Sequence, residues 1–279
     1  MVGQDFEAAY TALLARWPQP VETLDIDTRL GRTRVHSAGQ PEAPPMLLIS
    51  GGGACSPVWA DLVAGLVPTR RVLALDVPGD AGMSASPTHK PRNPAEVAHW
   101  LEEVLSALAL EHVVVVGHSY GAWLALTHAI HHPDRLKHLV LVDPTDCFTR
   151  PARTYLMHAL PLFLAPSTSR RQAFLSWETG GRGIDPDATA LWANQGRPAV
   201  LLRPTLPSAE ELGELRVPVS VLLAERSRVH DIVALDRLVR TRIPGAAINT
   251  LAGVSHHAIP TEHPEQLATQ LLRTTTDDR

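Results

Sequence analysis

One serine, Ser119, stands in a Gly-X-Ser-X-Gly frame (residues 117–121) directly after the valine run 113–116. Such a run is typical of a strand buried on both faces, and the pattern that begins at Ala122 is helical and is closed by Pro133. The two glycines of the frame remove the Cβ atoms that would collide where strand and helix pass each other. A serine that only caps a helix also fits the frame, but the flanking strand and helix favour a turn that presents Ser119 as a nucleophile at the carboxyl end of a sheet.

The elements predicted around this turn alternate between strands and helices. The predicted strands cover 21–27 and 33–36 (a hairpin), 46–50, 71–76, 113–116, 138–143, 217–223 and 247–251, and the predicted helices cover 6–17, 58–66, 94–108, 122–130, 232–242 and 264–272. Strands that alternate with helices at this spacing need crossover connections. The pattern therefore predicts an α/β fold with a mainly parallel sheet.

The alternation breaks between about residues 144 and 212. This segment contains several prolines and three helical patches (155–164, 171–177 and 188–192), and it shows no strand pattern. An irregular helical insertion at one place between two core strands is expected to be a lid over an active site. We therefore predict a core in two parts, 1–143 and 213–279, with a lid over 144–212.

The composition excludes several other classes of protein. The chain has 279 residues, is 44% hydrophobic and carries a net charge of −4, with no run of lysine or arginine for nucleic acid. No window is long and apolar enough for a membrane span, and the start lacks a signal peptide pattern, so we expect a cytoplasmic protein. The only cysteines, Cys55 and Cys147, and the 14 scattered histidines lack metal-ligand spacing. We expect neither a metal nor a cofactor.

Four local patterns, in this order, resemble the α/β-hydrolase fold family over nearly the whole chain outside the lid. They are Ile-Ser-Gly-Gly-Gly (49–53), Asp-Val-Pro-Gly-Asp-Ala-Gly-Met-Ser (76–84), Gly-His-Ser-Tyr-Gly (117–121) and Leu-Ala-Gly-Val-Ser-His (251–256). The resemblance implies an eight-stranded, mostly parallel sheet with helices on both faces and a helical lid inserted between the sixth and seventh strands. It also implies a serine hydrolase with the order Ser, acid, His.

The resemblance assigns roles that the chemistry of a serine nucleophile also requires. Such a serine needs a base, and His256 is the candidate, with His257 as the nearest rival. The tetrahedral intermediate needs two backbone donors. We expect one from the amide of Tyr120, at the amino end of a helix, and the other from Gly52, with Gly53 as the alternative.

The acid is where the chain departs from the family pattern. The family reads Gly-X-X-Asp after the strand at 217–223, whereas this chain has Ser227 at the aspartate position. Asp143, Asp231 and Glu225 are the candidate replacements. Asp143 is preferred because it ends a buried strand and should emerge at the catalytic edge, and Asp231 comes next. The other interpretation of Asp143 is a cap at the entry to the lid.

These features predict a serine hydrolase that cleaves a carboxylic ester or lactone of a mainly apolar small molecule through an acyl-enzyme. The apolar residues of the predicted lid favour an apolar substrate. The missing acid at Ser227 keeps a second hypothesis open, in which a lyase, cyclase or isomerase uses the same pocket. A ligand-binding protein without activity is a third hypothesis. The expected partner is a small molecule, with no nucleic acid and no membrane, and a homodimer is one possible assembly.

Overall fold

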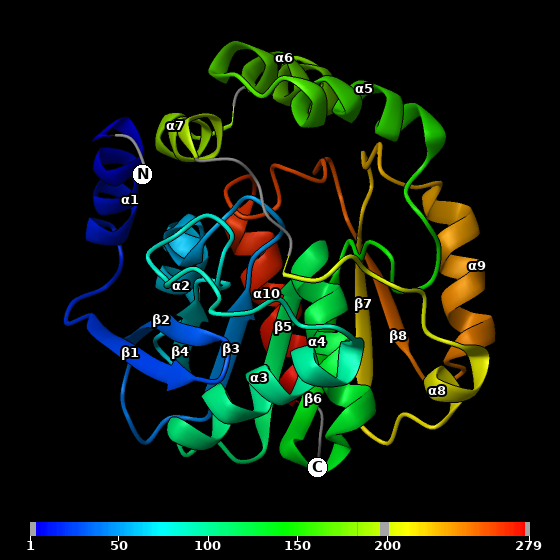
Figure 1. The fold of residues 1–279 in the computed structure, drawn as a ribbon. Helices are drawn as coiled ribbons and strands as arrows, with labels where there is room; N and C mark the ends of the chain where they lie inside the picture. The colour runs from blue at the N-terminus through cyan, green and yellow to red at the C-terminus, as the bar shows by residue number, and fades with distance from the viewer. Residues whose placement is uncertain (1–3, 183, 196–200, 277–279) are drawn as a thin grey trace.

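An eight-stranded sheet forms the centre of the protein in the computed structural model, which describes residues 4–182, 184–195 and 201–276 (Figure 1). The strands are β1 (Glu22–Thr28), β2 (Gly31–Ala38), β3 (Pro45–Ile49), β4 (Arg71–Leu75), β5 (Val113–His118), β6 (Leu136–Val142), β7 (Val219–Ala224) and β8 (Ala247–Leu251). Their spatial order is β1-β2-β4-β3-β5-β6-β7-β8. The hairpin β1–β2 is antiparallel and joins β4 antiparallel, whereas β3 to β8 run parallel. The predicted α/β fold is confirmed.

Helices cover both faces of the sheet. α3 (Pro94–Ala107), α4 (Tyr120–His131) and α9 (Ile232–Arg242) pack on one face, and α1 (Gln4–Ala15), α2 (Ala60–Leu66) and α10 (Pro264–Thr276) pack on the other. The four valines of β5 explain why this strand lies at the centre. Val113 and Val115 join the apolar cluster on the first face, while Val114 and Val116 join the cluster on the second. Both faces of β5 are thus buried, as its unbroken apolar run requires.

The chain between β6 and β7 contains α5 (Arg153–Leu164), α6 (Thr168–Thr179), α7 (Pro186–Asn194) and the short α8 (Ala209–Gly213). Helices α5 to α7 lie across one end of the sheet (Figure 1). An ion pair of 2.8 Å between Arg16 and Asp185 ties the start of α7 to the end of α1. The described part of this segment contains no strand, and α8 is a helix that the sequence pattern did not predict. The division into core and lid stays a prediction.

Two features near the site differ from the predicted boundaries. Helix α4 begins at Tyr120 rather than at Ala122, because the strand-to-helix turn contains only Ser119. The predicted helix over 58–66 starts as a 3₁₀ turn, Ser56–Trp59, and becomes α-helical from Ala60.

Within the described residues, no helix has the length and apolar character that crossing a membrane requires.

Candidate active site

The turn between β5 and α4 holds Ser119 in a left-handed backbone conformation, with φ 54° and ψ −117°. Its two glycines are required by close approach. A Cβ atom on Gly117 would collide with the backbone of Gly121 and Ala122, and one on Gly121 would collide with the carbonyl oxygens of Ile49 and Ser50. A non-glycine residue with positive φ is strained and persists only where the surroundings enforce it. The packing of β3 and α4 on the turn therefore holds Ser119 at the carboxyl end of β5.

Three side chains that are far apart in the sequence form one hydrogen-bonded chain at this point. His256 Nε2 lies 2.9 Å from Ser119 Oγ, and His256 Nδ1 lies 2.6 Å from Asp143 Oδ2. Ser119 follows β5, Asp143 follows β6 and His256 lies on the loop after β8, so the carboxyl ends of parallel strands bring them together. This is the geometry of a nucleophile, a base and a carboxylate that orients the base.

Asp143 is fully buried and its carboxylate has three donors. Oδ1 accepts a hydrogen bond from the Ala224 amide (3.1 Å), and Oδ2 accepts one from the Ser227 hydroxyl (2.7 Å) in addition to that from His256. Burial raises the pKa of Asp143, but the hydrogen bond and charge of His256, with the bond from Ser227, outweigh burial and lower this pKa to about 2. Asp143 is therefore ionised at neutral pH, as the partner of an imidazolium must be.

The other two candidate acids lie in different environments. Asp231 is the N-cap of α9, where its Oδ1 accepts hydrogen bonds of 3.0 Å from the amides of Val233 and Ala234. Glu225 accepts a hydrogen bond of 2.6 Å from the Gly253 amide. Both carboxylates thus cap backbone groups, and Asp143 contacts the ring of His256. The role of Ser227, which supports Asp143 from the position where the family has its acid, was missed in the sequence.

The two predicted oxyanion donors line the space around Ser119 differently. The amide of Tyr120 lies in the first turn of α4, where helical amides have no partner within the helix. The Gly53 amide, the alternative donor, is used by Asp80, whose carboxylate oxygens lie 2.9 and 3.1 Å away. Gly52 lines the cavities on both sides of the site, so it stays the predicted second donor. Burial raises the pKa of Asp80 to about 7, although the amides of Gly53 and Ala81 oppose this shift.

The two histidines next to the proposed catalytic residues have other surroundings. Burial and the nearby His256 lower the pKa of His118 well below its ordinary value, so this ring is neutral. The ring of His257 packs against Phe174 and Trp192, with centroid distances of 5.3 and 5.5 Å. His257 is therefore a wall of the site that contacts α6 and α7, and its sequence position beside His256 does not bring it to Ser119.

Two cavities meet at this site and share Gly52, Trp192 and His257. The cavity beside Ser119 has a volume of about 50 Å³ and its other walls include Leu175, Ala188 and Leu191 from α6 and α7. The second cavity has about 180 Å³ and is mainly apolar. Its walls are Tyr155, Leu156, Ala159, Leu162, Phe163 and Phe174, with polar groups from Asp80, Arg171 and Gln195 at its edge. Arg171 is only 5% exposed and donates to the carbonyl oxygens of Ala193 and Gln195.

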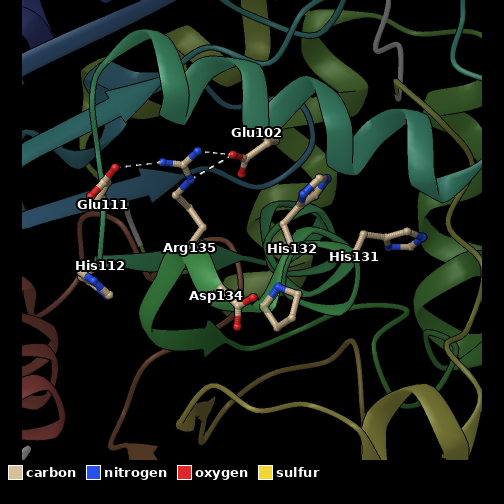
Figure 2. Close-up of a pocket in the computed structure, with 8 residues that line it drawn as sticks. Glu102, Glu111, His112, His131, His132, Asp134 and Arg135 are labelled. Carbon is tan, nitrogen blue, oxygen red and sulfur yellow. Dashed lines mark hydrogen bonds and ion pairs between the residues drawn. The ribbon is translucent and has the colours of Figure 1, made fainter.

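A different hollow, of about 400 Å³, lies at the amino ends of β5 and β6. Figure 2 shows Arg135 between Glu102 and Glu111 there, with the carboxylates 2.9 and 4.0 Å from the guanidinium nitrogens. His112, His131 and His132 line its edges, and the opposite end of the strands presents Ser119. Across residues 4–182, 184–195 and 201–276, no group of three or more histidine, cysteine or acidic side chains could hold a metal ion. The catalytic candidates therefore belong to the carboxyl edge of the sheet.

Comparison with known proteins identifies relatives along the full chain. Carboxylesterase YbfK of Bacillus subtilis (strain 168) is 25% identical over 97% of this chain and 93% of its own length. The uncharacterized carboxylesterase nap of the same strain is 24% identical over 97% of this chain and 92% of its own length. The crystal structure of naproxen esterase (carboxylesterase NP) from Bacillus subtilis superposes with a TM-score of 0.87 at 23% identity, over 98% of this chain and 99% of that one, which shows the fold.

The sequence profile of the alpha/beta hydrolase family matches residues 46–270. This range runs from the second residue of β3 past β8 and contains all of the residues that meet around Ser119. The predicted family resemblance is therefore confirmed: the chain belongs to the alpha/beta hydrolase family and is an enzyme of the hydrolase class.

Proposed function

We propose that this enzyme is a serine esterase that cleaves a carboxylic ester or lactone through an acyl-enzyme, with Ser119, His256 and Asp143 as its catalytic triad. The observation that carries the proposal is the continuous hydrogen-bonded chain from Ser119 Oγ through both ring nitrogens of His256 to Asp143. This series of hydrogen bonds begins in a cavity, at Ser119, and ends on the buried, ionised carboxylate of Asp143.

Acylation begins when Ser119 Oγ attacks the carbonyl carbon of the ester. His256 Nε2 lies 2.9 Å from Oγ and takes the hydroxyl proton, while Asp143 holds the opposite ring nitrogen and offsets the charge of the imidazolium. The amides of Gly52 and Tyr120 are proposed to bind the oxyanion. Collapse of the tetrahedral intermediate breaks the bond to the alkoxide, which takes the proton from His256 and leaves as the alcohol.

Deacylation repeats these steps with water. His256 removes a proton from a water molecule, whose oxygen attacks the acyl carbon, and Ser119 leaves with the proton returned from His256. The products are the carboxylic acid and the free enzyme. With a lactone, the alcohol that is released in the first step stays attached to the acyl group, so one product forms.

The shapes of the two cavities support an ester with one small and one larger apolar part. The larger cavity, about 180 Å³, is close in volume to a cavity of about 150 Å³ that is known to hold benzene in another protein. Its walls include the rings of Tyr155, Phe174 and Trp192. We propose that this cavity takes a group of the size of one aromatic ring, and that the smaller cavity beside Ser119 takes a short group.

Residues 144–212 are proposed to act as the lid. Helices α5 to α7 supply most of the larger cavity's apolar walls. Two of these wall residues, Leu156 and Phe163, are 47% and 65% exposed, so the cavity meets solvent along α5. An apolar substrate would enter between α5 and the core, since Leu156 and Phe163 present apolar surface both to the solvent and to the cavity.

The names of the relatives support the same proposal. Carboxylesterase YbfK and naproxen esterase are named as esterases, and each aligns with nearly all of this chain. The hypothesis of a non-hydrolytic enzyme rested on the serine at position 227. That reason is weakened, because Asp143 supplies a carboxylate to His256 from the neighbouring strand.

The proposal is tested with a fluorophosphonate probe and a panel of p-nitrophenyl esters that differ in acyl size. The wild-type enzyme should be labelled at Ser119, as read by mass spectrometry, and should prefer a phenyl-sized acyl group to a long acyl chain. Ser119→Ala should abolish labelling. A wild-type enzyme that is not labelled and hydrolyses none of the esters or a matched lactone panel would refute the proposal.

A further inference from the structure

Glu178, a residue of the proposed lid, lies buried against the loop that carries His256. It is the eleventh residue of α6 and is only 1% exposed. Its Oε1 accepts a hydrogen bond of 3.0 Å from the amide of His256, and its Oε2 accepts one of 3.1 Å from the amide of His257. One carboxylate from α6 therefore binds two consecutive backbone amides, the first of which belongs to the proposed base.

A carboxylate in this position carries a negative charge into the site. Burial raises the pKa of Glu178, but the hydrogen bonding and charge of His257, together with the charge of His256, outweigh burial, and this pKa lies below its ordinary range. His257 Nδ1 lies 3.6 Å from Glu178 Oε2. Glu178 is therefore ionised at neutral pH, and two carboxylates approach His256: Asp143 at the ring and Glu178 at the backbone.

We propose that Glu178 is a positioning residue that holds the backbone of His256 in place, so that the base is aligned with Ser119 only while α6 is docked on the core. This inference rests on the proposed esterase function. The 2.9 Å contact between His256 Nε2 and Ser119 Oγ depends on where the loop after β8 places the Cα of His256. Two hydrogen bonds from neighbouring amides to one carboxylate fix that position, because a bond to an ionised acceptor is stronger than a neutral one.

The arrangement also links the lid to catalysis. The helix that donates Glu178 also supplies Phe174 to the larger cavity and Leu175 to the smaller one. A substrate that stabilises the docked position of α6 would therefore also keep the Glu178 carboxylate against the loop that carries His256. Movement of α6 away from the core would break both bonds to the loop and leave His256 without this support.

The test compares Glu178→Gln with the wild-type enzyme. Glutamine has the same shape, but its NH₂ group would face one of the two amides, so that two donors oppose each other, and the negative charge is lost. We expect kcat to fall by about 10- to 100-fold, with KM changed by less than about 3-fold, because a misplaced base affects the chemical step. The acidic limb of the pH–rate profile should also move to lower pH, since a positive charge that forms at the site loses one neighbouring carboxylate.

Several other titratable groups surround His256 and Glu178 and can also influence the pH profile. The titratable groups that face His256 or Glu178 come from β5, β6, α5 and the loops after β7 and β8; they are His118, Asp143, Tyr155, His230 and His257. The pKa values of His118 and His257 are both lowered, chiefly by burial. The Glu178 carboxylate opposes this lowering at His257, so its loss lowers the pKa of His257 further, and a shift of the limb reports the loss of the Glu178 charge.

The matched control is Asp185→Asn, an acid-to-amide change at the start of α7 that contacts Arg16 and the Ala188 amide rather than the loop after β8. It should leave kcat and the pH profile unchanged. If Glu178→Gln is not recovered as a folded protein, Glu178→Asp replaces it. That variant keeps the charge but withdraws the carboxylate by one methylene, so it should lower kcat without moving the acidic limb.

The same fluorophosphonate reaction distinguishes a failure of the positioning role of Glu178 from a failure of the esterase proposal. A labelled wild-type enzyme and a Glu178→Gln enzyme labelled about 10-fold or more slowly would support the positioning role. Equal rates of labelling and equal pH profiles in these two proteins would overturn that role and leave the esterase proposal intact. A wild-type enzyme that is not labelled would overturn both.

Discussion

The substitution Asp143→Asn tests the triad most directly, because it changes one charge at a site with three known donors. In the wild-type enzyme, Oδ1 accepts the Ala224 amide and Oδ2 accepts both the Ser227 hydroxyl and His256 Nδ1–H. Asparagine keeps one carbonyl oxygen, which can serve Ala224. Its NH₂ group then faces His256, and a donor at this point favours the ring tautomer with its proton on Nε2, toward Ser119. The base can no longer accept the serine proton.

The expected fall in kcat of the Asp143→Asn enzyme follows from the interactions that His256 loses. The hydrogen bond between Asp143 and the charged imidazolium contributes about 1.5–3 kcal/mol. The wrong tautomer adds to this loss, and together we expect a barrier higher by about 5 kcal/mol, which is a fall of roughly 10⁴-fold in kcat. The assay is steady-state hydrolysis of a p-nitrophenyl ester near pH 7.5, with circular dichroism to show that the variant is folded.

The matched control for this prediction is Asp231→Asn. Asn and Asp are equally good at the N-cap of a helix, so this variant should keep both its activity and its stability. A folded Asp143→Asn enzyme that retains more than about one tenth of the wild-type kcat would refute the assignment of Asp143 as the acid. A large loss in Asp231→Asn would move the acid to that position.

Four further outcomes are expected. Ser119→Ala should lower ester turnover by at least about 10³-fold without a change in the unfolding midpoint, and comparable turnover would exclude an acyl-enzyme. Ser227→Ala should lower kcat by about 10-fold, since Asp143 loses a donor, whereas an unchanged kcat would show that Ser227 is not needed there. Gly117→Ala should lower the free energy of unfolding in urea by about 1–3 kcal/mol, because the new Cβ collides with the backbone of α4, and full stability would contradict this packing. The pKa of Asp143 is about 2, below its ordinary 3.8, so the stability that ionised Asp143 adds to the folded state is complete above pH 3.8 and is lost as pH falls through 2. This loss, on the order of 2 kcal/mol in the free energy of unfolding, should be absent from the acid unfolding curve of Asp143→Asn.

The turn around Ser119 could be predicted because most of its causes are local. A buried valine run, two glycines and a helical pattern lie within about twenty residues, and the steric conflict at Gly117 involves the nearby backbone of Gly121 and Ala122. The conflict at Gly121 is not local, because it involves Ile49 and Ser50 at the end of β3. The strand pattern and the family motifs likewise predicted the α/β sheet. The order of the strands along the sheet does not follow from such local patterns, because β2 pairs with β4 across some forty residues.

The strand pattern narrowed the acid to three residues and favoured Asp143, which ends a buried strand, but it did not show which partner each carboxylate contacts. Asp143, Asp231 and Glu225 all follow strands that end at the same edge of the sheet. Their roles differ because each side chain points to a different partner: a ring nitrogen, the amides of α9 or the amide of Gly253. Directions of this kind depend on the packing of distant segments, which a strand pattern does not encode.

Glu178 was missed for a related reason. A single glutamate in a helix usually faces solvent, and nothing in the local sequence of α6 distinguishes this one from an exposed residue. Its burial depends on how α6 docks onto the loop after β8, some eighty residues later. A carboxylate that follows Phe174, Leu175 and Trp177 in one short apolar patch is the weak signal that could have drawn attention to it.

The contact between Ser227 and Asp143 has a consequence for the history of this enzyme. The hydroxyl and the carboxylate lie 2.7 Å apart although they follow different strands, so the family's usual acid position and the acid proposed here lie next to each other. An acid can therefore pass from one strand to the next during evolution while the serine and the histidine stay where they are. The intermediate step has a barrier, because two carboxylates at this distance would repel each other and one would be protonated. On the proposed assignment, an alignment that searches only the column of Ser227 for the acid would miss the carboxylate that contacts His256 in this enzyme.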